Sequence, residues 1–194
     1  MSHQTGRSLT EDRVRPRVGD LAPDVELLLP GEGVVPLSAY WEDGPVVLVF
    51  LRYFGCPFCQ AQVVGLREER DLFEDTSAEV VLVGQGDATA EAAFREARGV
   101  PFPILLDAER HAYRAYGLSR GTSMQLFGPK VALPFLRANL HHETRQHGLK
   151  GGSFRQMPGT FVVDADGMVR FAHRNRTVAD NPTNAALLDV LRGC

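Results

Sequence analysis

This sequence has few cysteines, three in 194 residues, and it has no long apolar run. Residues 1–20 hold no stretch suited to a signal peptide, and no segment approaches the roughly 20 apolar residues of a membrane span. Neither charge dominates, because the net charge is −3 and the basic residues are dispersed among acidic ones. These features argue against a secreted disulfide-rich domain, a membrane protein and a nucleic-acid-binding protein, and they favour a soluble cytoplasmic one.

Two of the three cysteines lie close together. Cys56 and Cys59 enclose Pro57 and Phe58, directly after the apolar run 45–51. A C-x-x-C at a strand-to-helix turn brings two sulfurs within bonding reach, and the first sulfur lies at a helix N-terminus, where the helix dipole favours the thiolate. The spacing therefore predicts a dithiol that can open and close.

A structural zinc site is the main alternative for such a pair. It normally needs four ligands arranged as two close pairs, and this chain offers one pair of cysteines. Cys194 is the last residue, and His141, His142 and His147 do not follow the pair at zinc-finger spacing. We therefore expect no metal site and a polar helix face for the histidines. For Cys194 we expect an intermolecular disulfide or no role, rather than a third catalytic thiol.

Short β-branched runs alternate with amphipathic stretches along the chain, which predicts an α/β fold around a central sheet. A G-x-G pattern at residues 84–87 is too short to indicate nucleotide binding. The expected strands are about 25–29, 34–37, 46–52, 79–83, 102–106, 160–164 and 168–173, and the expected helices are about 57–75, 88–98, 108–116 and 184–191.

One domain accounts for the chain length and the 44% apolar content. We expect residues 1–16 to form a flexible tail and residues 17–194 a single domain. Several glycines interrupt residues 119–156, which we interpret as an insertion containing a helix at about 130–146.

The order of these elements resembles the thioredoxin fold over nearly the whole chain: strand, C-x-x-C, helix, strand and helix, then residues 157–160 leading into a hairpin and a last helix. The resemblance implies a central mixed sheet flanked by helices, with the helical insertion before the proline-led strand. It also implies a cis Met157–Pro158 bond lying against the dithiol. An X-Pro bond is cis in only roughly 5% of cases, so this expectation comes from the resemblance alone.

Residues 18–24 and 51–59 resemble more narrowly the peroxiredoxins and the alkyl hydroperoxide reductase/thiol-specific antioxidant group, in the branch that carries a C-x-x-C. One group of that branch is similar to prostamide/prostaglandin F synthases. The resemblance implies an antioxidant thiol oxidoreductase that reduces a peroxide or an endoperoxide. It needs no bound cofactor, and its electrons come from an external thiol such as a thioredoxin or a low-molecular-weight thiol. Peroxiredoxin-like folds often pair, so a homodimer is one expected state.

The sequence also departs from typical peroxiredoxins, which have Pro and Thr or Ser seven and three residues before the reactive cysteine. Val49 and Tyr53 occupy those positions relative to Cys56, and Arg52 and Cys56 occupy them relative to Cys59. The hydroxyl and the proline are thus absent in either register.

In this scheme Cys56 attacks and Cys59 resolves, since Cys59 lies inside the first helical turn. Met157 and Pro158 are expected to contact the substrate beside the dithiol.

A cation should stabilise the thiolate. Arg52, Arg120, Arg174 and Arg176 are the candidates, and we prefer Arg120 because it opens the insertion. Two of these arginines also have a purely structural interpretation, namely a salt bridge for Arg52 and a solvated loop for Arg120.

Two other functions use the same dithiol. A disulfide oxidoreductase would act on protein partners, and a redox-sensing interaction protein would use the disulfide to switch the 119–156 insertion. Phe127, Phe135 and Leu136 are either the lining of an apolar substrate pocket or ordinary core residues.

Overall fold

The computed structural model describes residues 15–128, 131 and 152–194. Seven strands form one mixed sheet in the order β2-β1-β5-β4-β3-β6-β7. β3, β4 and β5 run parallel, and the other neighbours are antiparallel. The strands are β1 (Glu26–Leu29), β2 (Gly33–Pro36), β3 (Val46–Phe50), β4 (Glu79–Gly84), β5 (Ile104–Leu106), β6 (Gly159–Val163) and β7 (Val169–Arg174).

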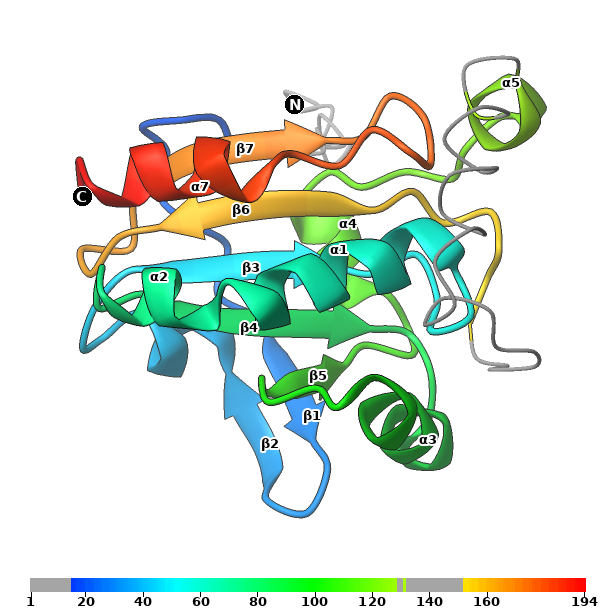
Figure 1. The fold of residues 1–194 in the computed structure, drawn as a ribbon, viewed down its shortest axis with the longest axis horizontal. Helices are drawn as coiled ribbons and strands as arrows, with labels where there is room; N and C mark the ends of the chain where they lie inside the picture. Colours follow the sequence, from blue (N-terminus) through cyan, green and yellow to red (C-terminus); the bar gives the residue numbers. More distant parts are fainter. Residues whose placement is uncertain (1–14, 129–130, 132–151) are drawn as a thin grey trace, which may run out of the picture.

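Helices cover both faces of the sheet (Figure 1). Side chains of β3 alternate between two apolar clusters, with Val47 and Val49 in one and Leu48 and Phe50 in the other. The first cluster also holds residues of α1 (Pro57–Glu68), α2 (Arg70–Glu74), α3 (Ala88–Arg98) and α7 (Asn184–Leu191). The second holds residues of η1 (Leu37–Tyr40) and α4 (His111–Ala115). The central strand is therefore buried on both faces, as its continuous apolar sequence predicts.

The predicted elements mostly form where expected. α3 begins after Asp87, whose side chain accepts a hydrogen bond from the Ala90 N–H, and ends at Gly99 with φ of 55°. α7 has the predicted bounds. The expected helix at 57–75 is instead two helices, α1 and α2, which are separated at Glu69 (φ −107°, ψ 20°). None of the helices in the described residues is long and apolar enough to cross a membrane.

The insertion contains one short described helix, α5 (Ser123–Phe127), which starts with a capping box between Thr122 and Gln125. The helix expected at about 130–146 lies outside the described residues apart from Val131. Residues 1–14 of the expected tail also lie outside them. The division into tail, domain and insertion stays a prediction.

The glycines of the G-x-G pattern are explained by packing. A Cβ on Gly84 would lie 2.5 Å from the Phe54 ring, and so would a Cβ on Gly86. The Phe54 ring itself stacks on Phe94, with 5.1 Å between ring centroids. Both glycines therefore make room for an aromatic side chain of the segment before the dithiol.

The prediction of a cis Met157–Pro158 bond is wrong, because no peptide bond among the described residues is cis. The trans form is the intrinsic preference of an X-Pro bond, by about 0.5–1 kcal/mol. Its neighbours are also satisfied in this form: the Met157 N–H donates to the Ser119 carbonyl at 3.0 Å, and the Pro158 carbonyl accepts from the Asn175 N–H at 3.3 Å. These two hydrogen bonds form with the trans bond, so they add nothing that would oppose the intrinsic trans preference.

Candidate functional site

The two close cysteines lie where β3 gives way to α1. Cys56 is the N-cap residue of α1 in an extended conformation, and Pro57 occupies the first helical position, where its missing N–H costs nothing. Cys59 lies within the first turn, and its sulfur accepts a hydrogen bond from the Arg52 backbone N–H at 3.3 Å. Both are free thiols and both are buried, with exposed fractions of 0% and 1%.

The two thiols have opposite pKa shifts. Burial alone would raise the pKa of Cys56, but hydrogen bonds from the Cys59 side chain and from the Cys59 and Phe58 backbone, together with the Arg52 charge, lower it from 9.0 to about 7. The hydrogen bond to Cys56, followed by burial, raises the pKa of Cys59 well above its usual value. Cys56 therefore ionises more readily than Cys59, while the attacking role of Cys56 and the resolving role of Cys59 stay predictions.

Arg52 supplies a positive charge that acts on both thiols of this pair. Arg52 is buried, with 6% of its surface exposed. Its Nε donates to the Phe154 carbonyl at 2.6 Å, and its guanidinium lies 5.2 Å from the centre of the Tyr53 ring. No carboxylate within the described part of the chain pairs with it, so a structural salt bridge does not explain the buried charge. A buried cation without an anionic partner favours the anionic form of a neighbouring thiol.

Gln85 holds the backbone around Arg52. Its side-chain nitrogen donates to the Arg52 carbonyl and, at 3.2 Å, to the Ser153 carbonyl. Its side-chain oxygen accepts from the Ser153 N–H at 2.9 Å. One amide therefore ties the segment before the dithiol to the segment that carries Phe154, the acceptor for the Arg52 guanidinium.

A largely apolar pocket of about 390 Å³ lies beside the dithiol. We call it the dithiol pocket, and its lining residues are Arg52, Tyr53, Pro57, Phe58, Leu126, Phe127, Val131, Phe154 and Val178. Neither sulfur is exposed, so a molecule in this pocket first meets the Pro57 and Phe58 side chains that lie between the two cysteines in the chain. Reaction with Cys56 therefore requires a local movement that exposes its sulfur.

The residues predicted to bind substrate do not line this pocket. Arg120 is exposed and forms an isolated antiparallel bridge with Gln156. Met157 is buried in the same apolar cluster as the two cysteines, yet Met157 and Pro158 line a different cavity. The part of these three residues in substrate binding stays a prediction.

Arg174 and Arg176 line that other cavity as well. Of the four candidate arginines, Arg52 is thus the one that the structure brings to the dithiol pocket, whereas the sequence favoured Arg120.

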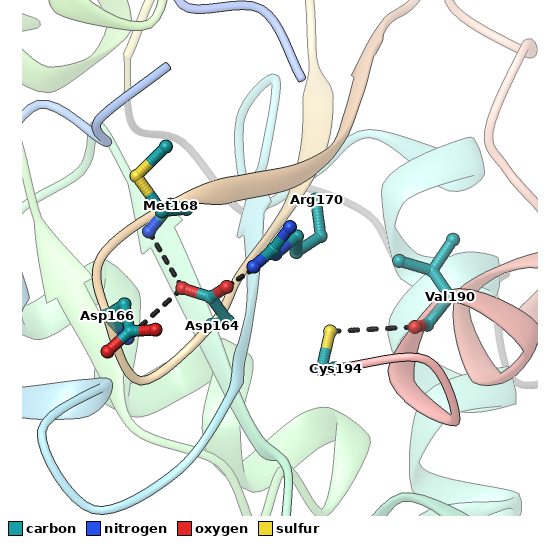
Figure 2. Close-up of polar contacts among 6 residues, drawn as sticks. All are labelled: Asp164, Asp166, Met168, Arg170, Val190 and Cys194. Atoms are coloured by element: carbon teal, nitrogen blue, oxygen red, sulfur yellow. Dashed lines mark hydrogen bonds and ion pairs between the residues drawn. The ribbon is translucent and has the colours of Figure 1, made fainter. Parts of the chain in front are cut away.

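The third cysteine is remote from this site. Cys194 lies at the end of the sheet opposite the start of α1 (Figure 1). Its sulfur is 3.5 Å from the Val190 carbonyl and lies near the ion pair between Asp164 and Arg170, as Figure 2 shows. Burial, followed by the Asp164 charge, raises the pKa of Cys194, so this thiol is less ionised than an ordinary one.

The histidines at positions 141, 142 and 147 lie outside the described residues. Within the described ranges, no group of three or more potential metal ligands comes together.

Some residues of the site have weak sequence signals. Phe127 was a candidate for pocket lining and does line the dithiol pocket, with 73% of its surface exposed. Gln85 was hidden in a G-x-G pattern, and Phe154 and Val178 lie between 95 and 122 residues after the two cysteines in the sequence. Only the folded chain brings such distant residues together, so no local pattern could reveal them.

Three comparisons with known proteins bear on this site. The model of the AhpC/TSA family matches residues 18–172. A thioredoxin-like protein AAED1 of Arabidopsis thaliana chloroplasts is 29% identical over 82% of this chain, and human peroxiredoxin-like 2C is 26% identical over 79%. The prostamide/prostaglandin F synthase of Salmo salar is 29% identical over 76%. The matches span 66%, 71% and 72% of those three proteins.

Solved structures share the fold. Peroxidoxin BcpB from Mycobacterium tuberculosis superposes with a TM-score of 0.68 at 24% identity, covering 92% of this chain and 97% of that one. A protein from Chlorobium tepidum, provisionally assigned as a thiol:disulfide interchange protein DsbE, reaches a TM-score of 0.59 at 21% identity, covering 91% and 99%. The prediction of a thioredoxin-like α/β fold with a central mixed sheet is confirmed.

Proposed function

Because this chain belongs to the AhpC/TSA family, as the match over residues 18–172 shows, we propose that it is a thiol-dependent reductase of apolar peroxides or endoperoxides. The observation that carries the proposal is the pairing of a Cys56 thiol of lowered pKa with a Cys59 thiol of raised pKa beside an apolar pocket. One sulfur is then ready to attack, while the other keeps its proton until it is needed.

The chemistry follows from this pairing. The Cys56 thiolate attacks one oxygen of the peroxide, the O–O bond breaks, and the other oxygen leaves as an alkoxide or hydroxide that takes up a proton. Cys56 is then a sulfenic acid, or a sulfenate ester when the substrate is an endoperoxide. Cys59 attacks that sulfur, releases water or an alcohol and closes the disulfide. An external thiol supplies the two electrons that restore the dithiol.

The pocket supports an apolar substrate. Apolar side chains such as Leu126 and Phe127 form most of its wall, and Arg52 supplies one positive charge near the reacting sulfur. Apolar groups of a substrate gain free energy from such a lining, whereas hydrogen peroxide has no apolar group to bury. The absence of the usual Thr or Ser, replaced here by Tyr53, also argues against specialisation for hydrogen peroxide.

Single-turnover kinetics test the proposal. The fully reduced Cys194→Ser variant, which keeps only the close pair, is mixed with cumene hydroperoxide or with hydrogen peroxide, and thiol loss is followed over time. We expect two thiols to be lost per peroxide, with a larger rate constant for cumene hydroperoxide. Cys56→Ser should abolish the reaction, and Cys59→Ser should stop it at the sulfenic acid.

A protein lacking Cys56 that reacts at the same rate would contradict the proposal. So would a complete failure of the reduced protein to react with either peroxide.

A second function is favoured by the rim of the dithiol pocket. Phe127 and Phe154 are 73% and 55% exposed, and exposed aromatic side chains beside a dithiol suit a protein partner. In that case the dithiol would exchange with a protein disulfide through a mixed disulfide. Reduced protein would then react with insulin disulfides faster than with cumene hydroperoxide, and Cys59→Ser would retain the partner covalently on Cys56.

A further inference from the structure

A second cavity, separate from the dithiol pocket, is lined by three arginines. It has a volume of about 230 Å³, and its wall includes Arg15, Arg174, Arg176, Ser119 and Asn175. We call it the arginine pocket. Among the described residues, its lining includes no aspartate or glutamate and shares no residue with the lining of the dithiol pocket.

Two of these arginines lie over the same glycine. A Cβ on Gly117 would lie 2.6 Å from Arg15 Cγ and 3.2 Å from Arg174 Nε. Gly117 also has φ of 69°, a conformation that residues with a side chain rarely adopt. Gly117, in the turn after α4, thus leaves space in which the side chains of Arg15 and Arg174 pack.

The guanidinium of Arg174 is held in place. Its Nε donates to the Tyr116 carbonyl at 2.8 Å and its Nη2 to the Pro16 carbonyl at 2.7 Å, while its face lies 5.0 Å from the centre of the Phe161 ring. A cation fixed in this way loses little conformational freedom when it binds a ligand.

The carboxylate of Asp180 lies beside this cavity, where it accepts a hydrogen bond from the Arg176 backbone N–H at 3.0 Å and lies 3.6 Å from His173 Nε2, but it does not pair with a guanidinium group of the described residues. No ion pair in the described part of the chain involves Arg15, Arg174 or Arg176. Burial, followed by repulsion from Arg15, lowers the pKa of Arg174. Charges of one sign gathered in a cavity and not paired with a counter-charge favour an anionic ligand.

One further group narrows the class of anion. The side-chain oxygen of Asn175 is buried and accepts no hydrogen bond from the described residues, although its nitrogen donates to Asn181 Oδ1 at 2.7 Å, so a donor in the cavity reaches this oxygen once the atoms that cover it move. A hydrogen phosphate or a singly protonated phosphate monoester offers several anionic oxygens to the arginines and also one O–H donor. A carboxylate offers two oxygens and no donor.

We propose that the arginine pocket binds a small phosphate-type oxyanion, either free or as a monoester. Arg15, Arg174 and Arg176 contact its oxygens, and Ser119 and Asn175 lie on the wall beside them. The site goes beyond the proposed reductase function, and binding does not need either thiol.

Isothermal titration of the full chain tests this proposal. The probes are inorganic phosphate, glycerol 2-phosphate and succinate, each at matched ionic strength in chloride. We expect saturable binding of phosphate with one site per chain. Arg15→Gln and Arg176→Gln should each weaken it about tenfold, the loss expected from one charge-assisted contact. Arg192→Gln, on an exposed arginine paired with Asp189, is the matched control and should bind as the parent does.

Each outcome of the titration has a definite meaning. Comparable binding of glycerol 2-phosphate would identify the ligand as a phosphate monoester, and binding of phosphate alone would identify the free anion. Both support the site. Failure of both to bind overturns it, as does equal or tighter binding of succinate, or an equal loss in Arg192→Gln. A Cys56→Ser protein should bind phosphate normally, so this site is tested independently of the reductase function.

Discussion

Replacing Arg52 with methionine tests the electrostatic origin of the reactive thiolate. Methionine keeps a long apolar side chain and the backbone N–H that donates to Cys59, but it removes the positive charge that, after the hydrogen bonds from Cys59, lowers the pKa of Cys56. We expect the pKa of Cys56 to rise from about 7 toward its ordinary value of 9.0. Arg120→Met, which changes the arginine favoured by the sequence, should leave the pKa unchanged.

The limits of the effect on rate follow from these two pKa values. Near neutral pH about half of the Cys56 thiols are ionised at a pKa of about 7, against about 1% at 9.0, a loss of about fifty-fold. A more basic thiolate is also a better nucleophile, with a Brønsted coefficient of about 0.4–0.5, which returns about eight-fold over two units. Complete reversal of the pKa shift would therefore slow the reaction of the variant about six-fold at neutral pH. At a pH where Cys56 is fully ionised in both the parent and the variant, it would accelerate the reaction about eight-fold.

The assay is the pH dependence of the single-turnover rate constant with cumene hydroperoxide, in the Cys194→Ser background. Thiolate absorbance in the ultraviolet gives the pKa of Cys56 directly. The Arg52→Met profile should cross that of the parent as the pH rises. If the two proteins have the same pKa, or if Arg120→Met shifts it and Arg52→Met does not, the assignment of the cation is refuted.

Three other perturbations have defined outcomes. Gly84→Ala should lower the free energy of unfolding by about 1–3 kcal/mol, because its Cβ would lie 2.5 Å from the Phe54 ring. Gly65 lies inside α1, and the nearest atom to a Cβ there would be Asn184 Nδ2 at 3.8 Å, so Gly65→Ala should instead raise the free energy of unfolding by up to about 1 kcal/mol. Chemical denaturation measures both changes. Phe127→Ala should raise KM for cumene hydroperoxide several-fold in steady-state kinetics without changing the rate with hydrogen peroxide; equal effects on both would contradict the pocket. The pKa of Cys56 is lower in the folded protein than in the unfolded chain, so folding stabilises the thiolate. The free energy of unfolding of the reduced protein should therefore rise relative to that of Cys56→Ser as the pH increases from about 7 to 9. Denaturation at several pH values measures this difference, and a difference that does not change with pH would contradict the prediction.

Local sequence predicted those features whose cause is local. α3 has both an Asp87 cap and a Gly99 terminator, so its bounds could be read from the residues. The run of β3 is apolar at every position, which gave its start at Val46, although the strand ends at Phe50, two residues before the predicted end. The position of Cys56 at the start of a helix and of Cys59 in its first turn could also be predicted, since it depends on one local segment.

Features that depend on tertiary contacts were predicted less well. Arg120 was preferred as the activating cation because it opens the insertion, yet the folded chain turns it to solvent and places Arg52 against the dithiol. Gln85 forms hydrogen bonds with Ser153, which lies 68 residues further along the chain, and such a distant contact leaves no periodic signal in the sequence. The cis Met157–Pro158 bond was taken from a family resemblance, and no residue pattern in this chain could test it.

The most direct test of the central claim is to locate the disulfide that forms when fully reduced protein receives one equivalent of cumene hydroperoxide. Peptide mapping by mass spectrometry then identifies the linked cysteines. The account predicts an intramolecular bond between Cys56 and Cys59, with Cys194 still reduced. A bond that includes Cys194, or an unchanged dithiol with the peroxide still present, would contradict it.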